Sequence, residues 1–231
     1  MNKIILYLTI LFIGNMYAQT FSFEGKTFQA VNATASVVKH KGKKALKVER
    51  DLQKIPFDVK RLEATVDEPT YLKLVGEDFT DGVIEVTMLS EIQNPSPFEN
   101  AQGFIGIAYR ISPNDTAFEN IYVRPKAAES GNQLFRNHTV QYYAYPDFKF
   151  EKLRKPEYGG QYESYASVGL NRWIKFRIEV SGKTAKLYID NNKEPIFIVN
   201  EMLGKTLSGG IALWVDIGTV GYFRNIKIIK K

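Results

Sequence analysis

The chain of 231 residues is 44% apolar and 24% charged, which is the composition of a globular protein and excludes a disordered one. It has no cysteine and two histidines, which excludes disulfides, thiolate metal sites, cysteine nucleophiles and a His-rich metal cage. The net charge of +6 permits attraction to polyanions but does not specify nucleic acid.

The first eighteen residues have the pattern of a signal peptide. Lys3 supplies the positive charge, residues 4–13 form an apolar run, and Ala18 is a small residue at a suitable cleavage position. The run is shorter than the roughly 20 residues of a membrane span. We expect an exported protein, periplasmic or secreted, whose mature form is not embedded in a membrane. Without cysteine it is not a lipoprotein; a retained N-terminal anchor is the alternative.

Most of the mature chain alternates between apolar and polar residues, a period of two that predicts strands. In residues 173–180, for example, Ile174, Phe176 and Ile178 share one face. Further strands are predicted, between turn residues, at 36–40, 45–49, 71–75, 82–89, 104–111, 120–124, 139–145, 185–189, 196–199, 210–215 and 222–229. No segment keeps a helical period for more than two turns. About a dozen short strands predict a sandwich, a jelly roll or a barrel in a single domain over residues 19–231.

Two long segments between these strands stand out. Residues 90–102 carry two prolines, and residues 146–161 have the sequence PDFKFEKLRKPEYGGQ. Loops of this length in a compact β domain are often functional.

The last third of the chain is similar to the closing strands of concanavalin A-like lectin and glucanase domains, including the laminin-G-like group. The residues that carry the similarity are Trp173 followed by 181–190 (SGKTAKLYID), then 209–214 (GGIALW) and 222–228 (YFRNIKI).

The centre of the chain resembles exported bacterial relatives of the 3-keto-disaccharide-hydrolase-like domain, in residues 103–110 (GFIGIAYR), 118–125 (FENIYVRP) and 136–142 (RNHTVQY). Together the resemblances cover residues 20–230 and imply an all-β, two-sheet antiparallel β-sandwich, a concanavalin A-like jelly roll. This fold hosts lectins, hydrolases and lyases alike, so it does not define an activity.

The alternation also predicts which residues form the core of such a sandwich. These are apolar residues on the faces expected to point inward: Ile105, Ile107, Ile121, Val123, Val140, Ile174, Phe176, Ile178, Leu187, Ile211, Leu213 and Ile226.

On the opposite faces, strand parity gathers cationic, aromatic and amide side chains. We expect one concave groove that contains Arg110, Tyr122, Arg124, Gln141 and Tyr143, with Arg136, Asn137 and His138 at its rim. Aromatic rings stack on sugar rings and guanidinium groups bind hydroxyls or carboxylates, so this groove suits a glycan. Ligand binding is accordingly assigned to Arg110, Glu119, Tyr122, Arg124, Arg136, Asn137 and Gln141. The alternative is a solvated face with ion pairs, such as Arg124 with Glu119.

His138 is the candidate catalytic base or acid because histidine is the side chain suited to proton transfer at neutral pH, and Tyr143 is a candidate partner. His, Tyr, Arg and Gln together would serve a polysaccharide lyase, in which a base removes the proton beside a uronate carboxylate. The alternative is a histidine with a structural hydrogen bond at a loop edge.

Other chemistries lack their sequence patterns. The E-x-D-x-x-E pattern of laminarinases is absent, as are phosphate-loop, dinucleotide and serine-elbow motifs. No metal site or cofactor is predicted, although residues 78–82 or 190–192 could supply oxygens to a structural calcium. Each of these is more simply a turn.

Three functions remain open at this stage. The first is an exported module that binds an oligosaccharide or polysaccharide. The second is a glycan-cleaving enzyme, a lyase or a glycoside hydrolase, and the third is a structural or adhesion module. Clustered arginines without anions favour an acidic glycan as the partner, and export disfavours nucleic acid.

Overall fold

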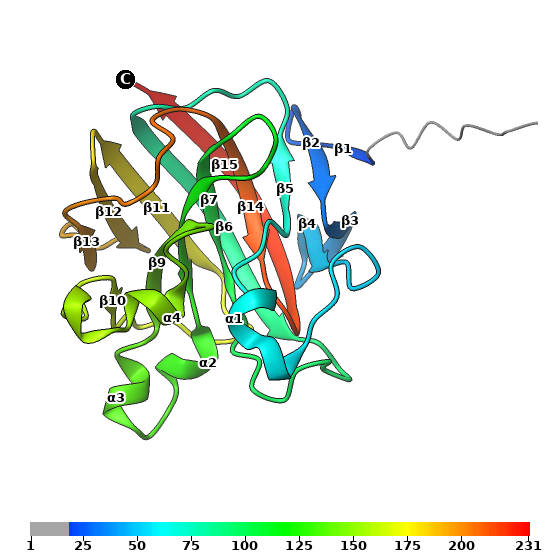
Figure 1. The fold of residues 1–231 in the computed structure, drawn as a ribbon. Coiled ribbons are helices and arrows are strands. Elements are labelled where there is room, and N and C mark those ends of the chain that lie inside the picture. Colours follow the sequence, from blue (N-terminus) through cyan, green and yellow to red (C-terminus); the bar gives the residue numbers. More distant parts are fainter. Residues whose placement is uncertain (1–18) are drawn as a thin grey trace, which may run out of the picture.

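Two antiparallel sheets pack face to face in the computed structural model, which describes residues 19–231 (Figure 1). The predicted signal peptide, residues 1–18, lies outside the described residues. In order across the eight-stranded sheet, the strands are β1 (Thr20–Phe23), β2 (Lys26–Val31), β5 (Tyr71–Leu74), β14 (Gly210–Val215), β7 (Ile105–Ile111), β8 (Phe118–Val123), β9 (Val140–Tyr145) and β10 (Glu163–Ser164). The seven-stranded sheet contains β13 (Phe197–Val199), β12 (Thr184–Ile189), β11 (Ile174–Ser181), β6 (Gly82–Ile92), β15 (Thr219–Lys230), β4 (Lys43–Arg50) and β3 (Ala33–His40).

The core lies between the inner faces of the two sheets. All twelve apolar residues predicted for the core are buried. Residues on alternate positions of the central strands, such as Ile105 and Ile107 in β7, meet Met88 and Phe176 of the opposite sheet within one cluster. The prediction of an all-β two-sheet sandwich is therefore confirmed.

A β-bulge explains how Ile226 reaches this core. In β15 the register against β6 shifts between Arg224 and Lys227, and Asn225 takes a φ of 53°. Simple alternation from the buried Phe223 would have pointed residue 225 inward. The extra residue reverses the parity of the strand, so Ile226 is buried instead.

The helical segments in residues 19–231 are single turns, and the sequence did not predict them. They are η1 (Val59–Arg61), α1 (Leu62–Thr65), α2 (Pro125–Ala128), α3 (Gln133–Arg136), α4 (Phe150–Leu153) and η2 (Pro156–Tyr158). The labelled helices gather at one end of the sandwich, the lower end in Figure 1. No helix in the described part of the chain is both long and apolar enough to cross a membrane.

Strands β7, β8 and β14 are buried along their whole length, on both faces. One face packs on the opposite sheet. The other, here called the outer face, lies beneath the segment that contains α1, where the indole of Trp214 donates to the carbonyl of Glu68 at 2.9 Å. The outer face is therefore a second packing surface rather than an open groove.

Candidate functional site

Tyr122 stands at the centre of an aromatic floor on the outer face. Its ring centroid lies 4.9 Å from that of Trp214, 5.8 Å from that of Tyr143 and 6.3 Å from that of Phe104. The register pairs Tyr122 with Gly106 of β7. A Cβ atom on Gly106 would lie 2.5 Å from the Cβ atom of Tyr122, so glycine at this position allows the two strands to approach.

A cavity of about 230 Å³ opens above this floor. Its walls come from six separate parts of the chain, including both long loops that the sequence marked as functional candidates. The lining residues are Leu62, Val66, Asp67, Phe98, Asn100, Gln102, Phe104, Tyr122, Arg124, Phe135, Phe150, Arg154 and Asp216.

Arg124 anchors one side of the cavity. Its guanidinium donates hydrogen bonds to the Tyr122 hydroxyl, to the His138 carbonyl at 2.7 Å and to Gln141 Oε1 at 3.4 Å. It also pairs with Glu163 at 3.3 Å. The side chain is thus fixed in place by neighbours on β8, β9 and β10.

Glu163 is the shared anion of this group of cations. Its carboxylate lies 2.7 Å from the Arg154 guanidinium and 2.6 Å from the imidazole Nδ1 of His138, in addition to its ion pair with Arg124. Burial raises the pKa of Glu163, but the Arg154 hydrogen bond and the charges of the surrounding cations outweigh it and hold the pKa below its usual value. Both arginines at this edge therefore have an anionic partner within the fold, which they share.

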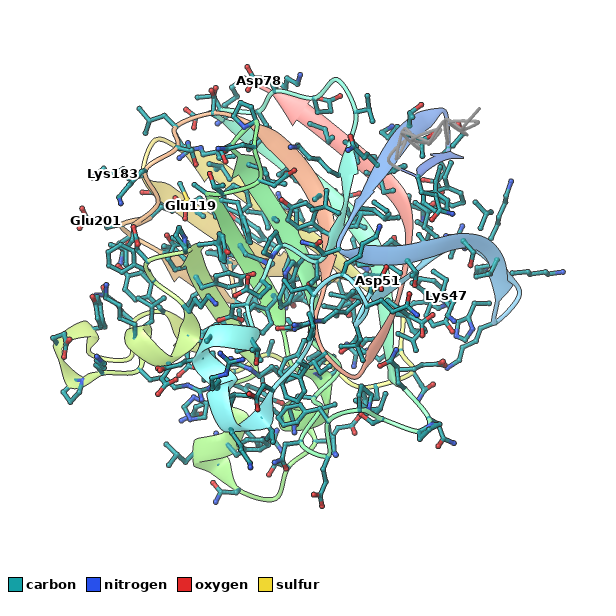
Figure 2. The ribbon with its side chains drawn as sticks, turned by 45° about the vertical axis from the view of Figure 1, so that its right-hand side comes forward. Lys47, Asp51, Asp78, Glu119, Lys183 and Glu201 are labelled. Atoms are coloured by element: carbon teal, nitrogen blue, oxygen red, sulfur yellow. The ribbon has the colours of Figure 1, made fainter. Side chains whose placement is uncertain are left out.

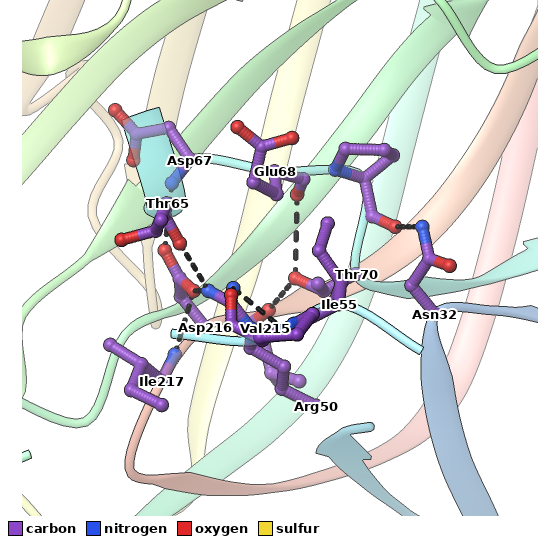
Figure 3. Close-up of polar contacts among 12 residues, drawn as sticks. Asn32, Arg50, Ile55, Thr65, Asp67, Glu68, Thr70, Val215, Asp216 and Ile217 are labelled. Atoms are coloured by element: carbon purple, nitrogen blue, oxygen red, sulfur yellow. Dashed lines mark hydrogen bonds and ion pairs between the residues drawn. The ribbon is translucent and has the colours of Figure 1, made fainter. Parts of the chain in front are cut away.

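Two buried aspartates lie on another side of the cavity (Figure 3). Asp216 follows β14 and pairs with Arg50 at 2.7 Å, and its other oxygen accepts the backbone N–H of Asp67 at 2.8 Å. Among the described residues the Asp67 carboxylate accepts one hydrogen bond, from the Phe150 N–H at 2.9 Å. Burial, then the charge of Asp216, raises the pKa of Asp67 to about 7.

Gln102 leaves one hydrogen-bond acceptor free. Its amide nitrogen donates to the Asn100 carbonyl at 2.9 Å, whereas its buried Oε1 has no partner among residues 19–231. A buried acceptor without a partner is costly. Gln102 lines the cavity, so rotation of its amide would bring this oxygen to a ligand with a hydroxyl or amide donor.

The structure brings four of the five predicted groove residues to one face. The register pairs Tyr122 with Gln141, and Tyr143 follows two residues later on the same side of β9. Of these four, Tyr122 and Arg124 line the cavity. Tyr143 is fully buried beneath it and accepts a hydrogen bond from Asn120 at 3.1 Å.

Arg110 lies elsewhere, and the prediction that it shares the groove is wrong. Its backbone takes a φ of 51°, and the pairing of β7 with β14 shifts register at this point. The bulge turns the side chain toward the other sheet. There the guanidinium donates to the carbonyls of Thr80 and Gly182 and pairs with Asp81 at 2.9 Å.

Glu119 also points away from the cavity. It shares the parity of Ile121, so its side chain is buried inside the sandwich (Figure 2). There it accepts hydrogen bonds from the Tyr142 hydroxyl and, at 3.0 Å, from the Gly204 N–H. Burial raises its pKa to about 7. Arg124 is paired with Glu163, not with Glu119 as the alternative interpretation supposed.

Glu119→Ala is expected to lower the free energy of unfolding by about 3 kcal/mol, because it leaves buried donors without an acceptor and opens a small cavity. Glu119→Gln keeps an acceptor of the same shape, so we expect a change of less than about 1 kcal/mol at pH 4, where the carboxyl with its raised pKa is protonated. Urea unfolding of the two variants measures both values. Equal losses in both would contradict the role of Glu119 as a hydrogen-bond acceptor.

The predicted rim residues lie beside α3, which ends at Arg136. The Arg136 guanidinium stacks over the ring of Tyr165 and donates to its hydroxyl at 2.7 Å. Asn137 is exposed and accepts from Gln133, and His138 is held by Glu163. These residues are near the network of Arg124 but do not line the cavity.

Several cavity residues escaped the sequence analysis: Asp67, Gln102, Phe104, Phe150 and Asp216. The unusual length of the two loops was the one available signal. The turns considered for calcium are engaged by protein donors, since Asp81 binds Arg110 and Asp190 binds Arg172. Residues 19–231 hold no cluster of three His, Cys, Asp or Glu side chains placed for a metal ion.

No family model and no curated protein matches the sequence. Among solved structures, the carbohydrate-binding module CBM66 from Bacillus subtilis is similar with a TM-score of 0.50 and 12% identity, over 85% of this chain and 94% of that one. A protein of unknown function with a galectin-like fold, also from Bacillus subtilis, gives a TM-score of 0.47 and 10% identity, over 86% of this chain and 90% of that one. Bacillus licheniformis β-glucanase gives 0.43 and 10%, over 92% and 82%. The sandwich is a concanavalin A-like jelly roll.

Proposed function

We propose that this is an exported carbohydrate-binding protein and that the cavity above Tyr122 holds the sugar. The observation that carries the proposal is an aromatic floor beside hydrogen-bonding groups that have capacity to spare, namely Gln102 Oε1 and the Asp67 carboxylate. A sugar offers apolar C–H faces to a ring and hydroxyl donors to such acceptors. The likeness to a carbohydrate-binding module is consistent with this use of the fold.

We further propose that the ligand is uncharged. The expectation of an acidic glycan depended on guanidinium groups without anions, whereas Arg110 is paired with Asp81, and both Arg124 and Arg154 with Glu163. The cavity also includes Asp67 and Asp216. The arginines of the cavity and its ion pairs (Arg50, Arg124 and Arg154) are matched in number by carboxyl groups (Asp67, Asp216 and Glu163), so no excess of positive charge favours an anionic sugar.

Cleavage of the glycan is the second candidate function. The observation that favours it is Asp67, whose pKa of about 7 suits a general acid at neutral pH. The elimination chemistry expected of His138 and Tyr143 has less support, because Tyr143 is fully buried and does not line the cavity.

Titration of the mature chain, residues 19–231, with a panel of neutral and acidic glycans tests these proposals. We expect neutral-sugar binding whose affinity changes little between about 50 and 500 mM salt. Simultaneous readings of absorbance at 235 nm and of reducing ends distinguish binding from lyase and hydrolase activity. Acidic glycans that bind more tightly and weaken with salt would contradict an uncharged ligand.

Tyr122→Ala is expected to weaken binding at least tenfold because it removes the aromatic floor. Since Tyr122 is buried, a thermal melt must show that the variant is folded. Phe104→Ala, at a half-buried wall position, supplies a second and milder perturbation. Arg172→Ala, on the surface and paired with Asp190, is the control. Undiminished binding by the folded Tyr122→Ala variant would contradict the proposal that this cavity binds the sugar.

A further inference from the structure

The cavity surrounds its occupant with apolar side chains on several sides. Leu62 and Val66 lie in the segment of α1, Phe98 and Phe104 follow β6, and Phe150 begins α4. They come from segments far apart in the chain, so a ligand meets apolar surface on more than one side.

Most of the polar groups of the cavity lie deeper than its phenylalanine rings. Asp67, Gln102, Tyr122 and Arg124 are buried, which places the polar groups at the base. Phe98, Phe104 and Phe150 are half-buried, and Phe135 is 41% exposed at the mouth. Two other mouth residues, Asn100 and Arg154, are exposed and polar, so water reaches the entrance. The phenylalanine walls therefore lie between a polar base and a solvent-exposed mouth.

An unmodified sugar would fit the polar base of the cavity but not its phenylalanine walls. Hydroxyl groups surround a sugar ring, and those that face the phenylalanine walls would lose water without gaining a hydrogen bond. Apolar walls instead stabilise an apolar group in proportion to the surface that it buries. A flat group can in addition stack on the phenylalanine rings or meet their edges.

We propose that the ligand is an uncharged sugar that carries an apolar substituent, such as an aryl ether or ester. The sugar hydroxyls bind the polar base, and the substituent extends along the phenylalanine walls toward Phe135. This inference rests on the proposed function, since it assigns a ligand class to the same cavity. It differs in requiring both parts of the ligand, the sugar and the apolar group.

Matched pairs of methyl and phenyl glycosides test the inference. Each pair shares one sugar, with glucose, galactose, mannose, xylose, arabinose and fucose in the panel, and calorimetry on residues 19–231 gives both affinities. For the sugar that binds, we expect the phenyl glycoside to bind at least about tenfold more tightly than the methyl glycoside. The octyl glycoside shows whether a flat group is required.

The outcomes separate the two proposals. Equal affinities for the methyl and phenyl glycosides would overturn this inference while the proposed function stands. Failure of every glycoside and glycan to bind would overturn the proposed function as well. Phenol binding as tightly as phenyl glycoside would show that the sugar is not recognised, which also overturns both.

Variants on α3 locate the substituent. Phe135→Ala is expected to reduce the phenyl-to-methyl affinity ratio at least threefold, because it removes the outermost aromatic wall. Leu134→Ala is the matched control, since Leu134 is 69% exposed on the same helical turn and does not line the cavity. A ratio that Phe135→Ala leaves unchanged, or that Leu134→Ala reduces equally, would contradict the proposed path of the substituent.

Discussion

Arg50→Ala is expected to lower the free energy of unfolding by about 3–5 kcal/mol, because it leaves the Asp216 carboxylate buried without its cation. Both side chains of the pair are almost completely inaccessible, at 2% and 3% exposure. Arg50 also donates to the carbonyls of Ile55 and Thr65, and so ties the segment before α1 to the end of β14 (Figure 3). Urea unfolding measures the loss.

Two comparisons control this experiment. Arg172→Ala breaks the exposed pair with Asp190 and should cost less than about 1 kcal/mol. The double variant Arg50→Met/Asp216→Asn should be more stable than Arg50→Ala, because it leaves no unpaired charge inside the protein. A loss below about 1 kcal/mol for Arg50→Ala would contradict the structural importance of the pair.

Asp67→Asn is expected to stabilise the protein at pH 8 and to leave its stability unchanged at pH 4. The pKa of Asp67 is raised from 3.8 to about 7 in the folded state. Between these values the folded state holds a proton that the unfolded state has lost, so the free energy of unfolding falls as pH rises. The fall ends near pH 7, and for this one group it amounts to about 4 kcal/mol at most.

Asparagine is a suitable replacement at this position. Asp67 has a φ of 57°, a left-handed conformation that asparagine tolerates, and its amide oxygen can still accept the Phe150 N–H. Urea unfolding from pH 4 to pH 8 measures the pH dependence of both proteins. Glu119→Gln removes the other carboxyl with a pKa of about 7. It should independently reduce the fall of the unfolding free energy over the same pH range. An unchanged slope in Asp67→Asn would contradict a raised pKa.

The pattern of the sequence was sufficient to predict the fold class, the core and much of one face. Alternation depends on backbone geometry alone, so it placed Ile105 and Ile107 inward and put Tyr122 and Gln141 together on the outer face. The same alternation also predicts that Glu119 points inward, because it shares the parity of the buried Ile121. Assigning Glu119 to the ligand overlooked that parity.

Tertiary structure decided the rest, because the deciding contacts join residues distant in the chain. Arg110 points away from the groove because its backbone is left-handed and lies at a bulge. The alternation of apolar and polar residues does not predict either feature. The cavity exists because the long loops fold back over β8, and Arg50, Asp67 and Asp216 become neighbours only when three separate segments pack together. Sequence alternation specifies on which side of a strand a residue lies. Which charges meet there, and how far their pKa values shift, depends on the water that packing excludes.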